Sequence, residues 1–162
     1  MAIHKLDFGE FDEIDYQLIA IHTSLEDYRL AYFINQKLFI NLSKNENEIL
    51  INIKEGETKF TRFYSFDVEK GISWNLIQNK NEVIQQKNNN SQNLFSNVTM
   101  EVATKVYLLS EFKKVDYFLK IENLDETKNL EAILTQLNTI DNLSTAYQID
   151  INKIKAKNNL IF

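Results

Sequence analysis

The stretch Tyr107–Glu122 constrains the fold of this chain most, because two strand-like runs flank a short polar break there. The runs are Val106–Leu109 and Val115–Glu122, and the break carries two adjacent lysines. In the second run apolar residues recur at every second position, which is the period of a β-strand (Val115, Tyr117, Leu119, Ile121). Lys120 and Glu122 alternate with them and are expected to face water. The pattern therefore predicts an antiparallel hairpin packed on a core through one face.

The same stretch resembles the signature of a protein family. Residues 109–117, LSEFKKVDY, are similar to the motif that names the IPExxxVDY family, small proteins of Bacteroidota. The matching positions are Glu111, Val115, Asp116 and Tyr117, while Leu109 stands for the isoleucine of the motif and Ser110 for its proline. Residues 21–32 and 159–162 are similar to the family as well. The resemblance implies a cytoplasmic bacterial protein, and it assigns no catalytic residue.

Length and composition restrict the possible functions. A chain of 162 residues has the size of one domain with a substantial core. Its 18 basic and 23 acidic residues give a net charge of −5, which disfavours extended contact with nucleic acid. Cysteine is absent, so disulfides, thiolate catalysis and cysteine-ligated metals are excluded. Because there is no signal-peptide core and no apolar run near the ~20 residues of a membrane span, we expect a cytosolic protein without membrane contact.

The residue types that carry chemistry do not form a recognisable catalytic or metal-binding pattern. His4 and His22 lack the spacing of zinc ligands, and no phosphate-binding loop or nucleophile motif is present. The acidic residues within 7–15 lack the glycine-centred spacing of a calcium loop and are expected to be a solvated lead-in. Glu111 and Asp116 are better explained by salt bridges or backbone capping than by acid–base catalysis. The sequence thus predicts no cofactor, no metal site and no enzyme.

Strand patterns alternate with two helices along the chain. A strand at Tyr16–His22 leads into a helix from about Ser24 to Lys37, with Thr23 and Glu26 in the spacing of a capping box. A second helix is expected from an N-cap at Asp125 through Leu137. The other predicted strands are Phe39–Leu42, Ile49–Ile53, Lys59–Asp67, Ile72–Gln78 and Leu143–Ile149, followed by a short basic helix over 151–157. Residues 87–99 are expected to be a mobile surface loop.

These elements predict a single α+β domain over residues 1–162, with two principal helices packed on a mainly antiparallel sheet. The strand–helix–strand unit over 115–149 has the size of half a ferredoxin-like or ACT-like fold. Trp74, the single tryptophan, is expected in the core or at its edge.

The helix predicted at 24–37 has apolar residues on two faces. Leu30, Ile34 and Leu38 form an aliphatic face that suits the core. Leu25, Tyr28 and Tyr32 lie on roughly the opposite face beside Arg29, and tyrosine and arginine are enriched at binding hot spots. We expect Tyr28, Arg29 and Tyr32, and the apolar segment Leu160, Ile161 and Phe162, to be interaction residues. In the alternative, the loop at 87–99 or residues 160–162 fold back and cover the tyrosine face.

Three functions remain open from the sequence. The leading one is a non-catalytic interaction module that binds a protein partner or a second copy of itself. The first alternative is an ACT-like regulatory domain that binds a small metabolite between a strand and a helix. The second is nucleic-acid binding through the basic patch Lys153–Lys157, which the negative net charge disfavours.

Overall fold

The computed structural model of the protein describes residues 16–54, 56–88, 99–125 and 129–162. Its strands are β1 (Tyr16–Thr23), β2 (Ser43–Lys44), β3 (Ile49–Ile53), β4 (Gly56–Phe60), β5 (Arg62–Asp67), β6 (Ile72–Gln78), β7 (Lys80–Asn88), β8 (Thr99–Tyr107), β9 (Tyr117–Glu122) and β10 (Leu143–Gln148). The α-helices are α1 (Asp27–Leu38) and α2 (Leu130–Leu137), and short 3-10 helices are η2 (Ser110–Phe112), η3 (Ile151–Lys153) and η4 (Lys157–Leu160).

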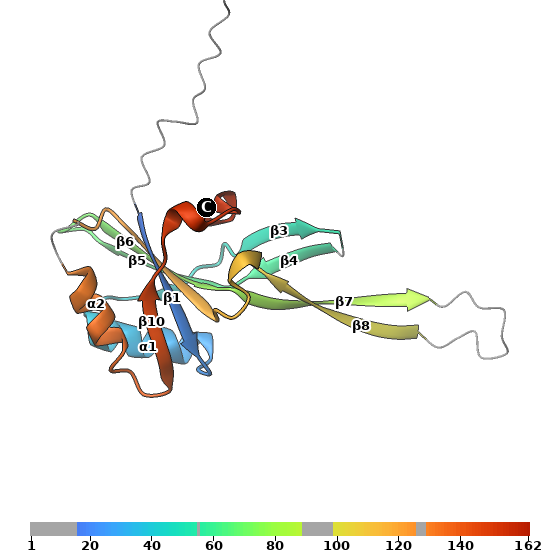
Figure 1. Ribbon diagram of the computed structural model, residues 1–162, viewed down its shortest axis with the longest axis horizontal. Coiled ribbons are helices and arrows are strands. Elements are labelled where there is room, and N and C mark those ends of the chain that lie inside the picture. Colours follow the sequence, from blue (N-terminus) through green and yellow to red (C-terminus); the bar gives the residue numbers. More distant parts are fainter. Residues whose placement is uncertain (1–15, 55, 89–98, 126–128) are drawn as a thin grey trace, which may run out of the picture.

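A six-stranded sheet with the order β10-β1-β9-β6-β5-β2 forms the centre of the molecule (Figure 1). Every neighbouring pair in it is antiparallel. The pairs β3–β4 and β7–β8 form two further hairpins outside this sheet. The predicted α+β fold with a mainly antiparallel sheet is therefore confirmed.

The strand β1 lies between β9 and β10, which come much later in the sequence. Ile21, for example, is paired with Tyr117 on one side and with Ala146 on the other. The segment β9–α2–β10 is thus a split β-α-β unit with β1 inserted between its strands, the arrangement found in ferredoxin-like folds.

The helices α1 and α2 cover one face of the sheet. Leu30 and Ile34 of α1 are fully buried there, so the predicted aliphatic face of this helix is confirmed. The sheet contributes the apolar side chains of Ile19, Ile21, Trp74, Leu76, Leu119 and Ile121. Burying one such side chain stabilises the fold by about 1.5–3 kcal/mol.

The opposite face of the sheet is also covered. Phe118 and Ile77 pack there under the hairpin β3–β4, which contributes Ile49 and Phe60. Residues after β10, including Ile154 and Leu160, complete this second cluster. Because of this layer Lys120 is only 5% exposed, so the expectation that it faces water is wrong. Alternation correctly placed Tyr117, Leu119 and Ile121 on one face, but Val115, which precedes β9, is buried in the second cluster instead. It also did not show that both faces are covered.

The predicted hairpin between Val106–Leu109 and Val115–Glu122 is wrong. The first half of the first run, Val106 and Tyr107, ends β8, which pairs with β7, while β9 pairs with β1 and β6. The two runs do not meet because the chain between them turns around the side chain of Asn79, which accepts from the Leu109 N–H (3.0 Å). The same side chain donates to the carbonyls of Phe112 (2.9 Å) and Val115 (2.8 Å).

Two other strand predictions are corrected. The strand predicted at Phe39–Leu42 is wrong, because the chain leaves α1 through Phe39 in the left-handed region (φ 54°) and Leu42 bonds with the Asn35 amide instead of a strand. The strand predicted at Lys59–Asp67 is divided at Thr61 into β4 and β5. The division sends Phe60 into the second cluster and Phe63 into the helix-side core.

The helix boundaries also differ from the predictions. Thr23 still lies in β1, its hydroxyl donates to the Asn142 carbonyl (2.7 Å), and α1 begins only at Asp27. α2 begins at Leu130 after the left-handed Asn129 rather than near Asp125, and residues 126–128 lie outside the described ones. The predicted basic helix is the pair of 3-10 helices η3 and η4.

The hairpin β7–β8, called the arm below, extends away from the sheet (Figure 1). Its register runs without a shift from Lys80 opposite Tyr107 to Asn88 opposite Thr99. The positions 87, 88 and 99 of the predicted loop are therefore strand residues, while 89–98, like the lead-in 7–15 and His4, lie outside the described residues. In the described part of the chain, no helix has the length and apolar character needed to cross a membrane.

Candidate functional site

The arm is joined to the sheet through Asn79, which is fully buried. Its backbone N–H donates to the Asp116 carbonyl (3.0 Å), and its own carbonyl accepts from Leu108 N–H (2.8 Å). With the three side-chain bonds described above, this residue holds β6, β7, β8 and the turn before β9 in one arrangement. The base of the arm is therefore fixed by buried hydrogen bonds, which are costly to leave unmade.

Asp116 and Glu111, the carboxylates of the motif, both bind backbone groups, as the sequence analysis predicted. Asp116 accepts from the Thr23 N–H (2.9 Å) and from the Lys80 ammonium (2.8 Å), so it connects β1 to the base of the arm. Glu111 accepts from the N–H groups of Lys155 (2.6 Å) and Ala156 (3.2 Å). Partial burial alone would raise the pKa of Glu111, but these bonds lower it below its ordinary value. The two carboxylates thus have structural roles.

Tyr117 fixes the entry into α1. Its hydroxyl donates to the Leu25 carbonyl (3.0 Å), and its ring belongs to the helix-side core. Burial, with a smaller contribution from the nearby carboxylates, raises the pKa of this phenol from 10.0 to about 12. The residues of the motif therefore connect segments that are distant in the sequence.

The predicted interaction residues on α1 lie on its outer face. Tyr28 is 60% exposed and Tyr32 57% exposed, and Arg29 between them is also exposed. The Tyr32 hydroxyl accepts from Gln36 (2.7 Å), and its ring meets Phe33 edge-on with centroids 5.6 Å apart. Leu25, which the helical pattern placed with them, is buried.

Residues 160–162 pack on the other face of the sheet, and so they do not cover this tyrosine face. The Leu160 carbonyl accepts from the Lys120 ammonium (2.8 Å), and Leu160 itself is buried. The ring of Phe162 lies between two cations, 4.8 Å from the Lys120 ammonium and 4.6 Å from the Arg62 guanidinium. Ile161 is exposed. The second possible cover, the loop within 89–98, lies outside the described residues.

Lys120 is the buried charge of the second cluster. Its ammonium lies 2.6 Å from Glu122 Oε1 and 4.9 Å from the ring of Tyr16. Among the described residues, three side-chain atoms are buried without a hydrogen-bond partner: Thr58 Oγ1, Arg62 Nε and Asn75 Oδ1. Burial also lowers the pKa of Arg62. The positive charge of Lys120 is balanced by Glu122, by the Leu160 carbonyl and by aromatic rings, which is the arrangement of a structural lysine.

A cavity of about 570 Å³ lies where α1, α2 and the start of β6 meet. Trp74 forms part of its wall, and its polar lining includes Lys37, Lys70, Asn123 and Gln136. The volume falls in the range of small-ligand sites, roughly 300–1,000 Å³. The lining carries two lysines and one carboxylate, Asp125, beside the start of α2, so its small positive net charge favours an anionic ligand.

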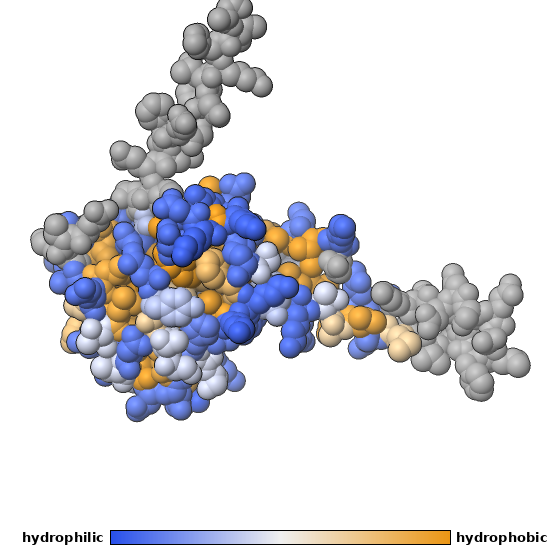
Figure 2. All heavy atoms as spheres, in the orientation of Figure 1, coloured by the Kyte–Doolittle hydropathy of each residue, from blue (hydrophilic) through white to orange (hydrophobic). Residues whose placement is uncertain are grey.

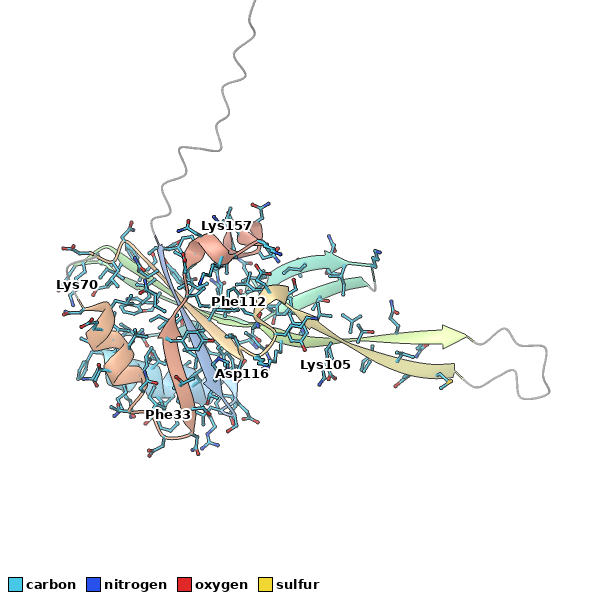
Figure 3. The ribbon with its side chains drawn as sticks, in the orientation of Figure 1. Phe33, Lys70, Lys105, Phe112, Asp116 and Lys157 are labelled. Carbon is cyan, nitrogen blue, oxygen red and sulfur yellow. The ribbon has the colours of Figure 1, made fainter. Side chains whose placement is uncertain are left out.

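The arm carries apolar side chains in contact with water. Ile84 of β7 is 65% exposed and Val102 of β8 36% exposed. Near the base, Val83 packs against the second cluster and Val106 is buried in it. Figure 2 shows apolar patches on the region of β3–β4 and on the arm, with hydrophilic residues between the patches. Figure 3 shows Lys105 on the arm and Asp116 where the arm joins the body.

The remaining candidates lie apart from these surfaces. Lys153 and Lys155 are exposed and Lys157 is partly buried, so the predicted basic patch is present after β10 but small. His22 lies 3.0 Å from the Tyr147 hydroxyl and stacks on its ring. The described residues contain no group of three potential metal-ligating side chains.

Sequence reasoning missed the arm and the cavity. In the run Lys80–Asn88, apolar and polar residues alternate only weakly and amide side chains are frequent, so the sequence pattern did not predict a strand there. One signal was available in its partner, since Val102, Thr104 and Val106 recur at the strand period and are β-branched.

Comparisons with known proteins give no relative for this chain: no family model, no curated protein and no solved structure matches it.

Proposed function

We propose that this chain is a non-catalytic, cytosolic protein-interaction module and that the arm is its main contact element. The supporting observation is that, within the described residues, β7 and β8 pair only with each other along nine positions. An isolated two-stranded ribbon is marginally stable in water. Exposed apolar side chains lie on both faces of this one: Val102, opposite Gln85, is on one face, and Ile84, opposite Ala103, is on the other. Open strand edges also offer backbone groups to a partner strand.

The base of the arm supports this role. Asn79, Asp116 and Lys80 fix the first residues of the arm to the sheet, so the ribbon leaves the body in a defined direction. A fixed base reduces the entropy that a partner must remove on binding. We further propose that Tyr28, Arg29 and Tyr32 form a second contact surface on α1, and that the chain belongs to the IPExxxVDY family it resembles.

The test is affinity purification of the full chain, followed by mass spectrometry of the proteins that remain bound. A double variant, Ile84→Ser with Val102→Ser, should lose the bound partner while melting close to the wild type, because both side chains are exposed. The matched control is Phe66→Ser, which changes an exposed apolar residue on β5 of the body. Equal retention by the wild type and the arm variant would contradict the proposal.

A second candidate function, binding of a small anionic metabolite, rests on the cavity beside Trp74. Because Trp74 is the single tryptophan and lines the cavity, its fluorescence reports directly on occupancy. Titration with a panel of small carboxylates and nucleotides should change this signal and raise the melting temperature. Lys70→Met should weaken the effect, whereas Lys44→Met, an exposed lysine on β2, should leave it unchanged.

A further inference from the structure

The outer edge of β8 has a sequence that is complementary to itself. The strand Thr99–Tyr107 has Ala103 at its midpoint, and its only charged residues are Glu101 and Lys105. These two carry opposite charges and stand at equal distances from the midpoint. When a second copy of β8 runs antiparallel with Ala103 opposite Ala103, Glu101 of each copy therefore lies opposite Lys105 of the other.

The backbone N–H groups of Glu101, Ala103 and Lys105 point toward this outer edge. The Leu108 N–H donates to the Asn79 carbonyl (2.8 Å), so at the base the even-numbered residue is bonded toward β7. Since the register of the arm has no shift, the even-numbered amides of β8 bond to β7 and the odd-numbered ones point outward. Glu101, Ala103 and Lys105 are odd-numbered, and all three are exposed. Among the described residues only β7 pairs with β8, so the outward backbone groups of this edge have no partner strand there and stand beside the complementary charges.

We propose that two copies of this chain associate through their β8 edges, with Ala103 on the two-fold axis, to form a continuous four-stranded sheet from two arms. Opposite charges directly across a strand pair are favourable and like charges are unfavourable. Lysine and glutamate on an exposed edge normally prevent self-pairing, but here each one meets its opposite. The face that carries Val102 then continues across both arms, with Val102 opposite Thr104 of the second copy.

This inference rests on the proposed role of the arm as a contact element and names its partner as a second copy of the chain. The contact is confined to one strand edge, so the association is expected to be reversible and dependent on concentration. It should also weaken as salt is added, because both ion pairs are exposed.

Sedimentation velocity of the full chain over a wide range of concentrations tests the proposal. The wild type should convert from monomer to dimer as the concentration rises. Glu101→Lys and Lys105→Glu should each weaken the dimer at least about tenfold, because each sets two like-charge pairs across the axis. An equimolar mixture of the two variants should dimerise again, and so should the double variant, since both restore opposite charges. Glu57→Lys on β4 is the control with the same change of charge.

A second variant tests the backbone part of the contact. Ala103→Pro removes an N–H that points away from β7, so the arm keeps its internal ladder while the central hydrogen bonds of the dimer are lost. A chain that stays monomeric at every concentration, or a dimer that is indifferent to the charge variants, would overturn the inference. A monomer whose arm still retains a different protein would overturn it as well, and would leave the proposed function intact.

Discussion

Two continuous stretches of chain, β6–β7 and β8–β9, each run through both the sheet and the arm, and their surroundings differ between the two regions. β6 continues into β7 through Asn79, and β8 returns into β9 through the turn around η2. In the sheet, β6 and β9 have neighbours on their outer edges and a packed layer on each face. In the arm, β7 and β8 have each other, with β4 against the base of β7. Strand pairing is common to both regions, so the two differ in their covering layers: the sheet is covered on both faces, whereas the arm is in contact with β4 near its base.

The largest difference between the sheet and the arm is expected in the loss of stability caused by truncating an apolar side chain. Leu119→Ala on β9 should lower the free energy of unfolding by about 2–5 kcal/mol, because it removes buried methyl groups and leaves a cavity. Ile84→Ala on the arm should stay within about 0.5 kcal/mol, because the side chain is already exposed. Urea unfolding of the two variants gives both values. A similar loss for both would mean that the arm is as well covered as the sheet.

The next largest effect is expected where the regions join. Asn79→Ala should cost about 2–4 kcal/mol, since it leaves the Leu109 N–H and two carbonyls buried without their partner. Hydrogen exchange should also become faster in β8 near the base of the arm. Asn52→Ala, an exposed amide on β3, is the control. If exchange in β8 is unaffected, the arm does not depend on this junction.

A smaller effect is expected at Tyr117, and it changes with pH. Tyr117→Phe should lose about 1 kcal/mol at neutral pH, the usual net value of one hydrogen bond. The pKa of the phenol is higher in the folded protein, about 12 instead of 10.0, so its contribution is complete below pH 10 and is lost as the pH rises to 12. The difference between wild type and variant should therefore shrink or reverse in that range. Chemical unfolding at neutral and at alkaline pH measures it, and a constant difference would contradict the assignment.

The smallest effect is expected at Glu111, on the acid side. Its pKa is lowered in the folded protein, so its contribution is present above the ordinary pKa of 4.5 and is lost as the pH falls through the folded value. Glu111→Gln should therefore be less stable than the wild type near neutral pH, by less than about 1 kcal/mol because the site is partly exposed. The two proteins should converge under acid, as followed by circular dichroism. Parallel acid profiles with an unchanged gap would exclude this role.

Much of the sheet could be predicted from alternation alone. The bounds of β3 and β6 agree with the sequence, and Trp74 is buried as expected. Partner choice could not be predicted, because the runs that flank residues 110–114 pair with strands elsewhere in the chain. The turn between them depends on Asn79, and an asparagine that far away gives no local signal of this role.

The candidate site was less predictable than the fold. The exposed tyrosines of α1 could be identified because helical periodicity separates them from Leu30 and Ile34. Lys120 could not, since a charged residue at an alternating position is normally solvated, and its burial requires residues some forty positions later. The cavity beside Trp74 is likewise formed by residues from three separated stretches, 37–38, 70–74 and 123–136, which local patterns do not bring together.

The position of β1 between β9 and β10 has a consequence for how the chain folds. Both edges of β1 pair with strands that begin about a hundred residues later in the sequence, whereas hairpins such as β5–β6 pair neighbouring segments. Before these strands pair with β1, its residues Leu18–Ile21 form an uncovered apolar strand with two open edges. All four are fully buried in the folded protein. Such non-local pairing slows folding and exposes the chain to misassembly. During synthesis, β1 therefore stays unpaired and uncovered until β9 and β10 have been made.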